Sequence, residues 1–273
     1  MTFRNIIFQN RNFTFKSIFM SLENANGSLE TTFQNTIATI QFGHPASNSF
    51  PRELLDRLTS EINSLSRNED VSVIILKSQG NKTFCSGASF DELLKVENEE
   101  QGLEFFSGFA HLLNAMRNCN KLIIGRVQGK AVGGGVGIIS ACDYVFATPQ
   151  SDIKLSELAI GIGPFVIEPA VSRKIGKSAM TEMTLSGHEW KSANWAFQKG
   201  LFSVLSEAEN LDNEVENFAT KLSSYNPEAL FEMKKIIWEG TETWESLLFE
   251  RAAITGRLVL SDFTKSALLQ FKK

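Results

Sequence analysis

The stretch AVGGGVGIISACD, residues 131–143, contains three consecutive glycines between the apolar run Leu122–Val127 and a segment of small residues. Glycine has no Cβ, so the backbone N–H groups of such a stretch can approach a ligand closely. The stretch also has the pattern of a helix start, where unpaired N–H groups and the helix dipole favour negative charge. The triplet therefore indicates an oxyanion hole. Taken alone, it is also compatible with a tight strand-to-helix turn that binds no ligand.

Short apolar runs alternate with amphipathic segments around this stretch. Strands are predicted at 36–41, 71–76, 122–127 and 144–147, where the residues are apolar or β-branched. Helices are predicted at 51–68, 104–117 and 133–142, with a short helix beginning near Ser89. Such alternation favours right-handed crossovers between parallel strands, and the predicted fold class is α/β.

The last third of the chain has the apolar spacing of helices. They are predicted at 177–185, 191–199, 208–224, 227–238 and 244–260. We therefore expect residues 21–190 to form the ligand-binding core and residues 191–273 to form a C-terminal helical region used for oligomerisation.

Composition excludes several classes of protein. The net charge of -4 and the scattered Lys and Arg residues disfavour nucleic-acid binding. The three cysteines form no even framework and no Cys-x-x-Cys pair, which argues against disulfides and a zinc site and favours a cytoplasmic protein. No apolar run is long enough to span a bilayer, so we expect no membrane partner.

The first twenty residues differ from the rest of the chain. They carry three basic residues, no acidic ones and five phenylalanines. Two interpretations stay open: a basic targeting peptide, or an extension outside the fold with Met20 as the functional start.

Three stretches together resemble the crotonase (enoyl-CoA hydratase/isomerase) superfamily. They are KTFCSGASFDEL at 82–93, VQGKAVGGGVGIISACDYVFA at 127–147 and LSELAIGIGP at 155–164. The resemblance implies a ββα spiral core with a C-terminal helical region, and an acyl-CoA thioester as the ligand. It implies no metal and no cofactor, because coenzyme A is part of the substrate.

The resemblance also implies which residues hold the thioester. The backbone N–H groups of Ala88 and Gly134 would point at its oxygen, where the charge of an enolate develops. The neighbouring residues expected to contact the substrate are Ser86, Ser89, Phe90 and Asp91.

Two glutamates are typical of the family's hydratases, and this chain keeps one. Gly137 stands where the first would be, whereas Glu157 matches the second. A lone carboxylate in an apolar segment should have a raised pKa and suit acid/base chemistry. One glutamate suffices to move a proton between carbons, as in the family's isomerases. A non-catalytic acyl-CoA-binding protein is the remaining alternative.

The segment after Glu157, residues 161–176, is similar to that of a bacterial branch associated with methylglutaconyl-CoA, in which the first glutamate also tends to be glycine. This similarity favours hydration of a branched enoyl-CoA such as 3-methylglutaconyl-CoA. Glu168 and His111 are secondary candidates for the site, and Lys82 for a coenzyme A phosphate, although ordinary structural or solvated roles are expected for all three. Similar crotonases form trimers or hexamers, so we expect a homotrimer or homohexamer.

Overall fold

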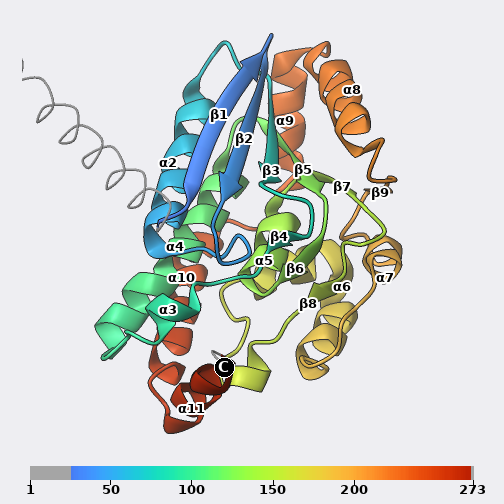
Figure 1. The fold of residues 1–273 in the computed structure, drawn as a ribbon. Helices are drawn as coiled ribbons and strands as arrows, with labels where there is room; N and C mark the ends of the chain where they lie inside the picture. Colours follow the sequence, from blue (N-terminus) through green and yellow to red (C-terminus); the bar gives the residue numbers. More distant parts are fainter. Residues whose placement is uncertain (1–25, 272–273) are drawn as a thin grey trace, which may run out of the picture.

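The computed structural model describes residues 26–271, so the predicted extension at 1–20 lies outside the described residues. The described chain contains a six-stranded sheet and a smaller three-stranded sheet (Figure 1). The larger sheet has the strand order β1 (Ser28–Gln34), β2 (Ile37–Gly43), β3 (Val73–Ser78), β5 (Leu122–Val127), β7 (Tyr144–Ala147) and β9 (Val204–Leu205).

The larger sheet is parallel from β2 onward. Only β1 runs antiparallel to its neighbour β2, and the tight turn between them places Asn35 at a φ of 53°. The first four residues of β3 are all buried, as expected for a parallel strand that is covered on both faces. The predicted strands at 122–127 and 144–147 are confirmed.

The smaller sheet brings together the three sequence motifs that are far apart in the chain. Its strands β4 (Thr83–Cys85), β6 (Lys130–Val132) and β8 (Ile153–Lys154) are parallel, and Ala131 pairs with both Cys85 and Ile153. Because parallel strands end at the same edge, the segments that follow them meet there. The site is built at this edge.

The helices cover both faces of the larger sheet. In chain order they are α2 (Arg52–Arg67), α3 (Phe90–Leu93), α4 (Glu99–Asn118), α5 (Gly134–Ala141), the 3₁₀ turn η1 (Leu158–Ile160), α6 (Glu168–Leu185), α7 (Ala193–Gln198), α8 (Leu211–Ser223), α9 (Pro227–Ile237), α10 (Trp244–Leu258) and α11 (Asp262–Phe271). The apolar stripe of α2 is buried in the main core, whereas α8 packs on the opposite face of the sheet in a second cluster with Ile75 and Phe146. The α/β fold class is as predicted.

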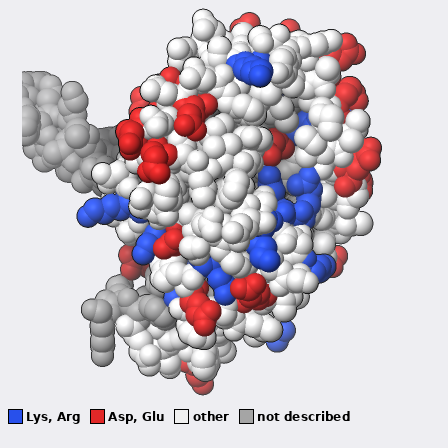
Figure 2. Space-filling view, turned by 90° about the vertical axis from the view of Figure 1, so that its right-hand side faces the viewer, with Lys and Arg blue, Asp and Glu red and all other residues white. Residues whose placement is uncertain are grey.

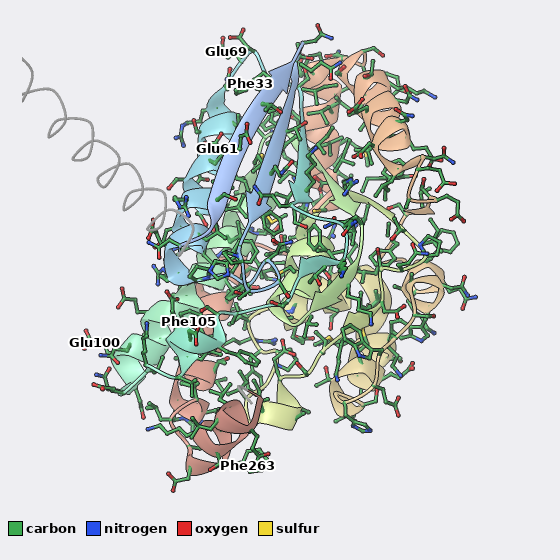
Figure 3. All side chains as sticks on the ribbon, viewed as in Figure 1. Phe33, Glu61, Glu69, Glu100, Phe105 and Phe263 are labelled. Carbon is green, nitrogen blue, oxygen red and sulfur yellow. The ribbon has the colours of Figure 1, made fainter. Side chains whose placement is uncertain are left out.

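Several elements differ from the sequence prediction. The short strands β4, β6, β8 and β9 were not predicted. Strand β1 was not predicted, because four of its seven residues are exposed and it shows no apolar alternation. Helix α6 begins at Glu168 rather than Lys177, although Gly176 does interrupt it with a φ of 78°. Helix α11 was not predicted either. It packs against η1, where a Cβ placed on Gly161 would lie 2.5 Å from the ring of Phe263 (Figure 3).

Helix α10 crosses α4 at very close range. A Cβ placed on Gly102 of α4 would lie 2.5 Å from the carbonyl oxygen of Gly256 on α10, so two glycines permit the crossing. The crossing inserts Thr255, 2% exposed, into the core beside the site. The C-terminal helical region, predicted only for oligomerisation, therefore also contributes to the pocket.

Candidate active site

A pocket opens where the three motifs meet. Gly87 and Ala88 come from the loop after β4, Gly133 and Gly134 from the start of α5, and Glu157 from the segment after β8. The rest of the wall is mostly apolar and is formed by Ser86, Phe90, Leu93, Phe106, Phe109, Val132, Ser156, Ile160, Ile162, Gly163, Pro164, Phe165, Val166, Ile167 and Thr255.

Two backbone donors in this pocket are unused. Phe50 bonds to the residues on either side of Ala88: its N–H donates to the Gly87 oxygen at 2.8 Å, and its oxygen accepts from the Ser89 N–H at 3.0 Å. The N–H of Ala88 therefore faces away from this bridge. Among the described residues, neither this N–H nor that of Gly134 donates a hydrogen bond. Two free donors in one pocket can stabilise an oxygen that gains negative charge.

Two glycines with positive φ allow the motifs to approach each other. Gly87 has a φ of +91°, and a Cβ on it would lie 3.0 Å from the Val132 oxygen and 3.6 Å from the Gly134 nitrogen. Gly133 has a φ of +54°, and a Cβ on it would lie 2.9 Å from Glu157 Oε1. A side chain at either position would strain the backbone and separate the donors from the carboxylate.

Glu157 places a carboxyl group in the pocket. Its Oε2 atom is fully buried and has no hydrogen-bond partner among the described residues. Burial of the carboxyl group raises the pKa of Glu157 to about 7, although a backbone hydrogen bond lowers it in part. Near neutral pH the group can therefore both accept and return a proton.

No second carboxylate lines the pocket. Within the described residues, Glu157 is the one ionisable group of the wall. Gly137, the position at which the family's hydratases carry a glutamate, is covered by Ile167: a Cβ placed on Gly137 would lie 2.4 Å from Ile167 Cγ2. An isoleucine thus occupies the space that a side chain at position 137 would need.

The structure brings most of the predicted site residues together. Ser86, Ala88, Phe90, Gly134 and Glu157 line the pocket. Two other predicted substrate contacts, Ser89 and Asp91, do not line it and belong to an adjoining depression with Ala46 and Ser49. The hydroxyl of Ser89 caps α3 by accepting from the Glu92 N–H at 3.4 Å.

The secondary candidates lie outside the pocket. Ser172 and Arg251 donate hydrogen bonds to Glu168 at the start of α6. Partial burial raises the pKa of this carboxyl group, but the hydrogen bonds and the charge of Arg251 outweigh burial, so the pKa is lowered. The exposed His111 packs against the ring of Phe249. Lys82 is exposed. Glu168 and His111 therefore have structural contacts in place of a role in this pocket.

Several wall residues were not predicted from the sequence. Phe106 and Phe109 come from α4, Ile167 from the residue before α6, and Thr255 from α10. Phe106, Phe109 and Thr255 lie far from the glycine motifs, and although Ile167 falls within the segment 161–176, no local pattern indicates that its side chain reaches the pocket. The other wall residues lie within the three recognised stretches at 82–93, 127–147 and 155–164, except Phe165 and Val166, which directly follow the last stretch.

Charged patches, metal-ligand groups and membrane-spanning helices could each indicate another kind of site. Figure 2 shows one face of the molecule, on which Lys and Arg side chains are interspersed with Asp and Glu. No group of three or more His, Cys, Asp or Glu side chains suited to a metal ion occurs within residues 26–271. In the same residues, none of the helices has the length and apolar character needed to cross a bilayer.

The chain belongs to the enoyl-CoA hydratase/isomerase family, whose model matches residues 32–258. It is 26% identical over 242 residues to the short-chain-enoyl-CoA hydratase of Clostridium acetobutylicum, covering 87% of this chain and 92% of that protein. It is 27% identical over 197 residues to a peroxisomal Delta(3,5)-Delta(2,4)-dienoyl-CoA isomerase of Arabidopsis thaliana, covering 66% and 69%.

Solved structures agree on the fold. The crystal structure of an enoyl-CoA hydratase from Bacillus halodurans superposes with a TM-score of 0.82 at 22% identity, covering 89% of this chain and 99% of that one. Fold, site and family together make this chain an acyl-CoA enzyme of the hydratase or isomerase type.

Proposed function

We propose that the protein is an enoyl-CoA isomerase that moves the double bond of a 3-enoyl-CoA thioester into conjugation with the thioester carbonyl. The observation that supports this most strongly is the single ionisable group of the pocket, Glu157, with its unpaired Oε2. A carbon-to-carbon proton shift needs one group that takes and returns the same proton, and it needs no activated water.

The proposed reaction has two proton transfers. The thioester oxygen accepts hydrogen bonds from the N–H groups of Ala88 and Gly134. Glu157 removes a proton from the α-carbon, and the electron pair of that C–H bond moves onto the thioester oxygen as a dienolate forms. The protonated Glu157 then delivers its proton to the γ-carbon, which leaves the double bond between the α- and β-carbons.

The wall of the pocket favours an uncharged acyl chain. A distal carboxylate, as in 3-methylglutaconyl-CoA, needs a cation or several donors when it is buried. No Lys, Arg or His is among the residues that line the described pocket, and the ionised Glu157 would repel a second anion. We therefore propose an uncharged enoyl group in preference to 3-methylglutaconyl-CoA.

Hydration of a branched enoyl-CoA is the second candidate. The buried Oε2 of Glu157 has a free acceptor position that a water molecule can use. In this reaction Glu157 would have to activate that water without help from a second carboxylate, because Ile167 covers Gly137.

A substrate panel with analysis in deuterium oxide separates these reactions. The purified protein is given a 3-enoyl-CoA, crotonyl-CoA, 3-methylcrotonyl-CoA and 3-methylglutaconyl-CoA, and the products are identified by mass spectrometry. We expect isomerisation of the 3-enoyl-CoA, with part of the original protium retained at the γ-carbon because one buried carboxylate carries it. A 3-hydroxyacyl-CoA as the main product would favour the hydratase, and turnover of none of the esters would overturn both proposals.

A further inference from the structure

The contact between Gly137 and Ile167 defines one wall of the pocket. Ile167 is 4% exposed and immediately precedes α6. Its Cβ would lie 2.7 Å from a Cβ on Gly137, and its Cγ2 still closer at 2.4 Å. The branched side chain therefore packs directly on the backbone of α5, and Ile167 rather than Gly137 lines the pocket.

This contact lies one helical turn from the carboxylate. The Gly137 N–H donates to the Gly133 oxygen at 3.3 Å, so the two glycines are on successive turns at the start of α5. Glu157 packs against Gly133, and Ile167 packs against Gly137. One turn advances about 5.4 Å along a helix. The apolar group and the carboxylate are thus side by side over the same end of α5.

A water molecule needs a polar cavity with two or more partners. Ile162, Val166 and Ile167 line the pocket that holds Glu157, and all three are apolar and no more than 5% exposed. Aliphatic side chains of this kind offer a water molecule no hydrogen-bond partner.

We propose that Ile167 is the residue that determines the outcome of the reaction, by keeping water away from the β-carbon so that the conjugated product leaves without being hydrated. The proposal rests on the isomerase function proposed above. Hydration would require the water oxygen to bond to the β-carbon while the π electrons move toward the α-carbon, which takes a proton from Glu157. The attacking water would at the same time have to lose one of its two protons to a second base, because Glu157 is engaged at the α-carbon, and no other ionisable group is among the described residues that line the pocket.

The test is the product ratio of variants at this wall. Ile167→Ala opens space beside Glu157, whereas Ile167→Val keeps the branched wall. Val171→Ala is a matched control, because Val171 is fully buried in the first turn of α6, close to Ile167 in the chain, and does not line the pocket. The double variant Gly137→Asp/Ile167→Gly removes the Cβ of residue 167, which would lie 2.7 Å from a Cβ on residue 137, and adds a carboxylate that can take the water's proton. For each folded variant, the ratio of 3-hydroxyacyl-CoA to 2-enoyl-CoA is measured with a 3-enoyl-CoA as the substrate.

We expect Ile167→Ala to raise this ratio by about tenfold or more and the double variant to raise it further, with Ile167→Val and Val171→Ala close to the wild-type ratio. An unchanged ratio in both Ile167→Ala and the double variant would overturn the proposal while leaving the isomerase function intact. A wild-type protein that already forms mainly 3-hydroxyacyl-CoA would overturn the role of Ile167 and the isomerase assignment together. Failure of the wild type to isomerise any 3-enoyl-CoA would contradict the proposed function itself.

Discussion

Gly133 lies so close to Glu157 that position 133 has no room for a side chain: a Cβ on Gly133 would lie 2.9 Å from Glu157 Oε1. The two residues belong to different motifs, one at the start of α5 and the other just before η1. This contact places the carboxylate against Gly133, the residue that precedes the free N–H of Gly134.

Replacing Gly133 with alanine should therefore impair catalysis. The new methyl group meets the carboxylate, and the φ of +54° is unfavourable for alanine. We expect kcat to fall by about 10- to 100-fold, because a displacement of the order of 1 Å misaligns the proton transfer. Steady-state kinetics with a 3-enoyl-CoA measure the effect. Gly240→Ala, at a positive φ with open space around it, is the matched control, and an equal loss in both variants would contradict this explanation.

The activity should depend on pH through Glu157. The carboxylate must be ionised to remove the α-proton, and its pKa is raised to about 7 by burial. We expect kcat/KM to decrease about tenfold per pH unit below that value and to level off above it. A pH–rate profile from pH 5 to 9 checks this. A flat profile across that range would contradict Glu157 as the base in the free enzyme.

The free energy of unfolding should also depend on pH through Glu157, but it should fall as the pH rises, whereas the activity should increase. The folded pKa of about 7 lies above the ordinary 4.5, so the folded state holds the proton more tightly than the unfolded state. The stability associated with the neutral carboxyl group is present below pH 4.5 and is lost as the pH rises through about 7. Glu157→Gln removes this dependence. The melting temperature of the variant should exceed that of the wild type by more at pH 8 than at pH 5; an equal difference at both pH values would refute the assignment.

The local parts of the site could be predicted from the sequence, whereas its walls could not. Glycine runs and short apolar strands specify local geometry, so Ala88, Gly134 and Glu157 were predicted to meet, and they line one pocket. Thr255 reaches the pocket from a helix that carries no motif, and the pattern of residues 161–176 does not indicate that Ile167 packs on Gly137. Their positions depend on long-range packing, such as the close crossing of Gly102 and Gly256, which one sequence does not reveal.

The same distinction applies to the fold. Buried strands such as β5 were predicted because most of their residues are apolar. Strand β1 is partly exposed and polar, so it depends on its pairing with β2 rather than on its own pattern. The first half of α6 follows a segment rich in glycine and proline that indicates a turn, yet Glu168 and Pro169 are suited to a helix start.

We further predict a homotrimer or homohexamer in solution. Large apolar side chains remain exposed on the C-terminal half of the described chain, including Leu185 at 73%, Phe263 at 65% and Ile236 at 56%. Such surface is costly in water unless another protein surface covers it. Light scattering at micromolar concentration should give the mass of a trimer or a hexamer, and a monomeric mass would contradict the prediction.

We propose that Glu157 is the single proton carrier of the pocket, and the decisive measurement is the turnover of the variant Glu157→Gln. Glutamine keeps the size of the side chain but cannot transfer the proton, so kcat on the best 3-enoyl-CoA should fall by about 10² to 10⁴. The affinity for the CoA ester, measured by calorimetry, should change little because the donors Ala88 and Gly134 are intact. Turnover by Glu157→Gln close to the wild-type rate would contradict the account.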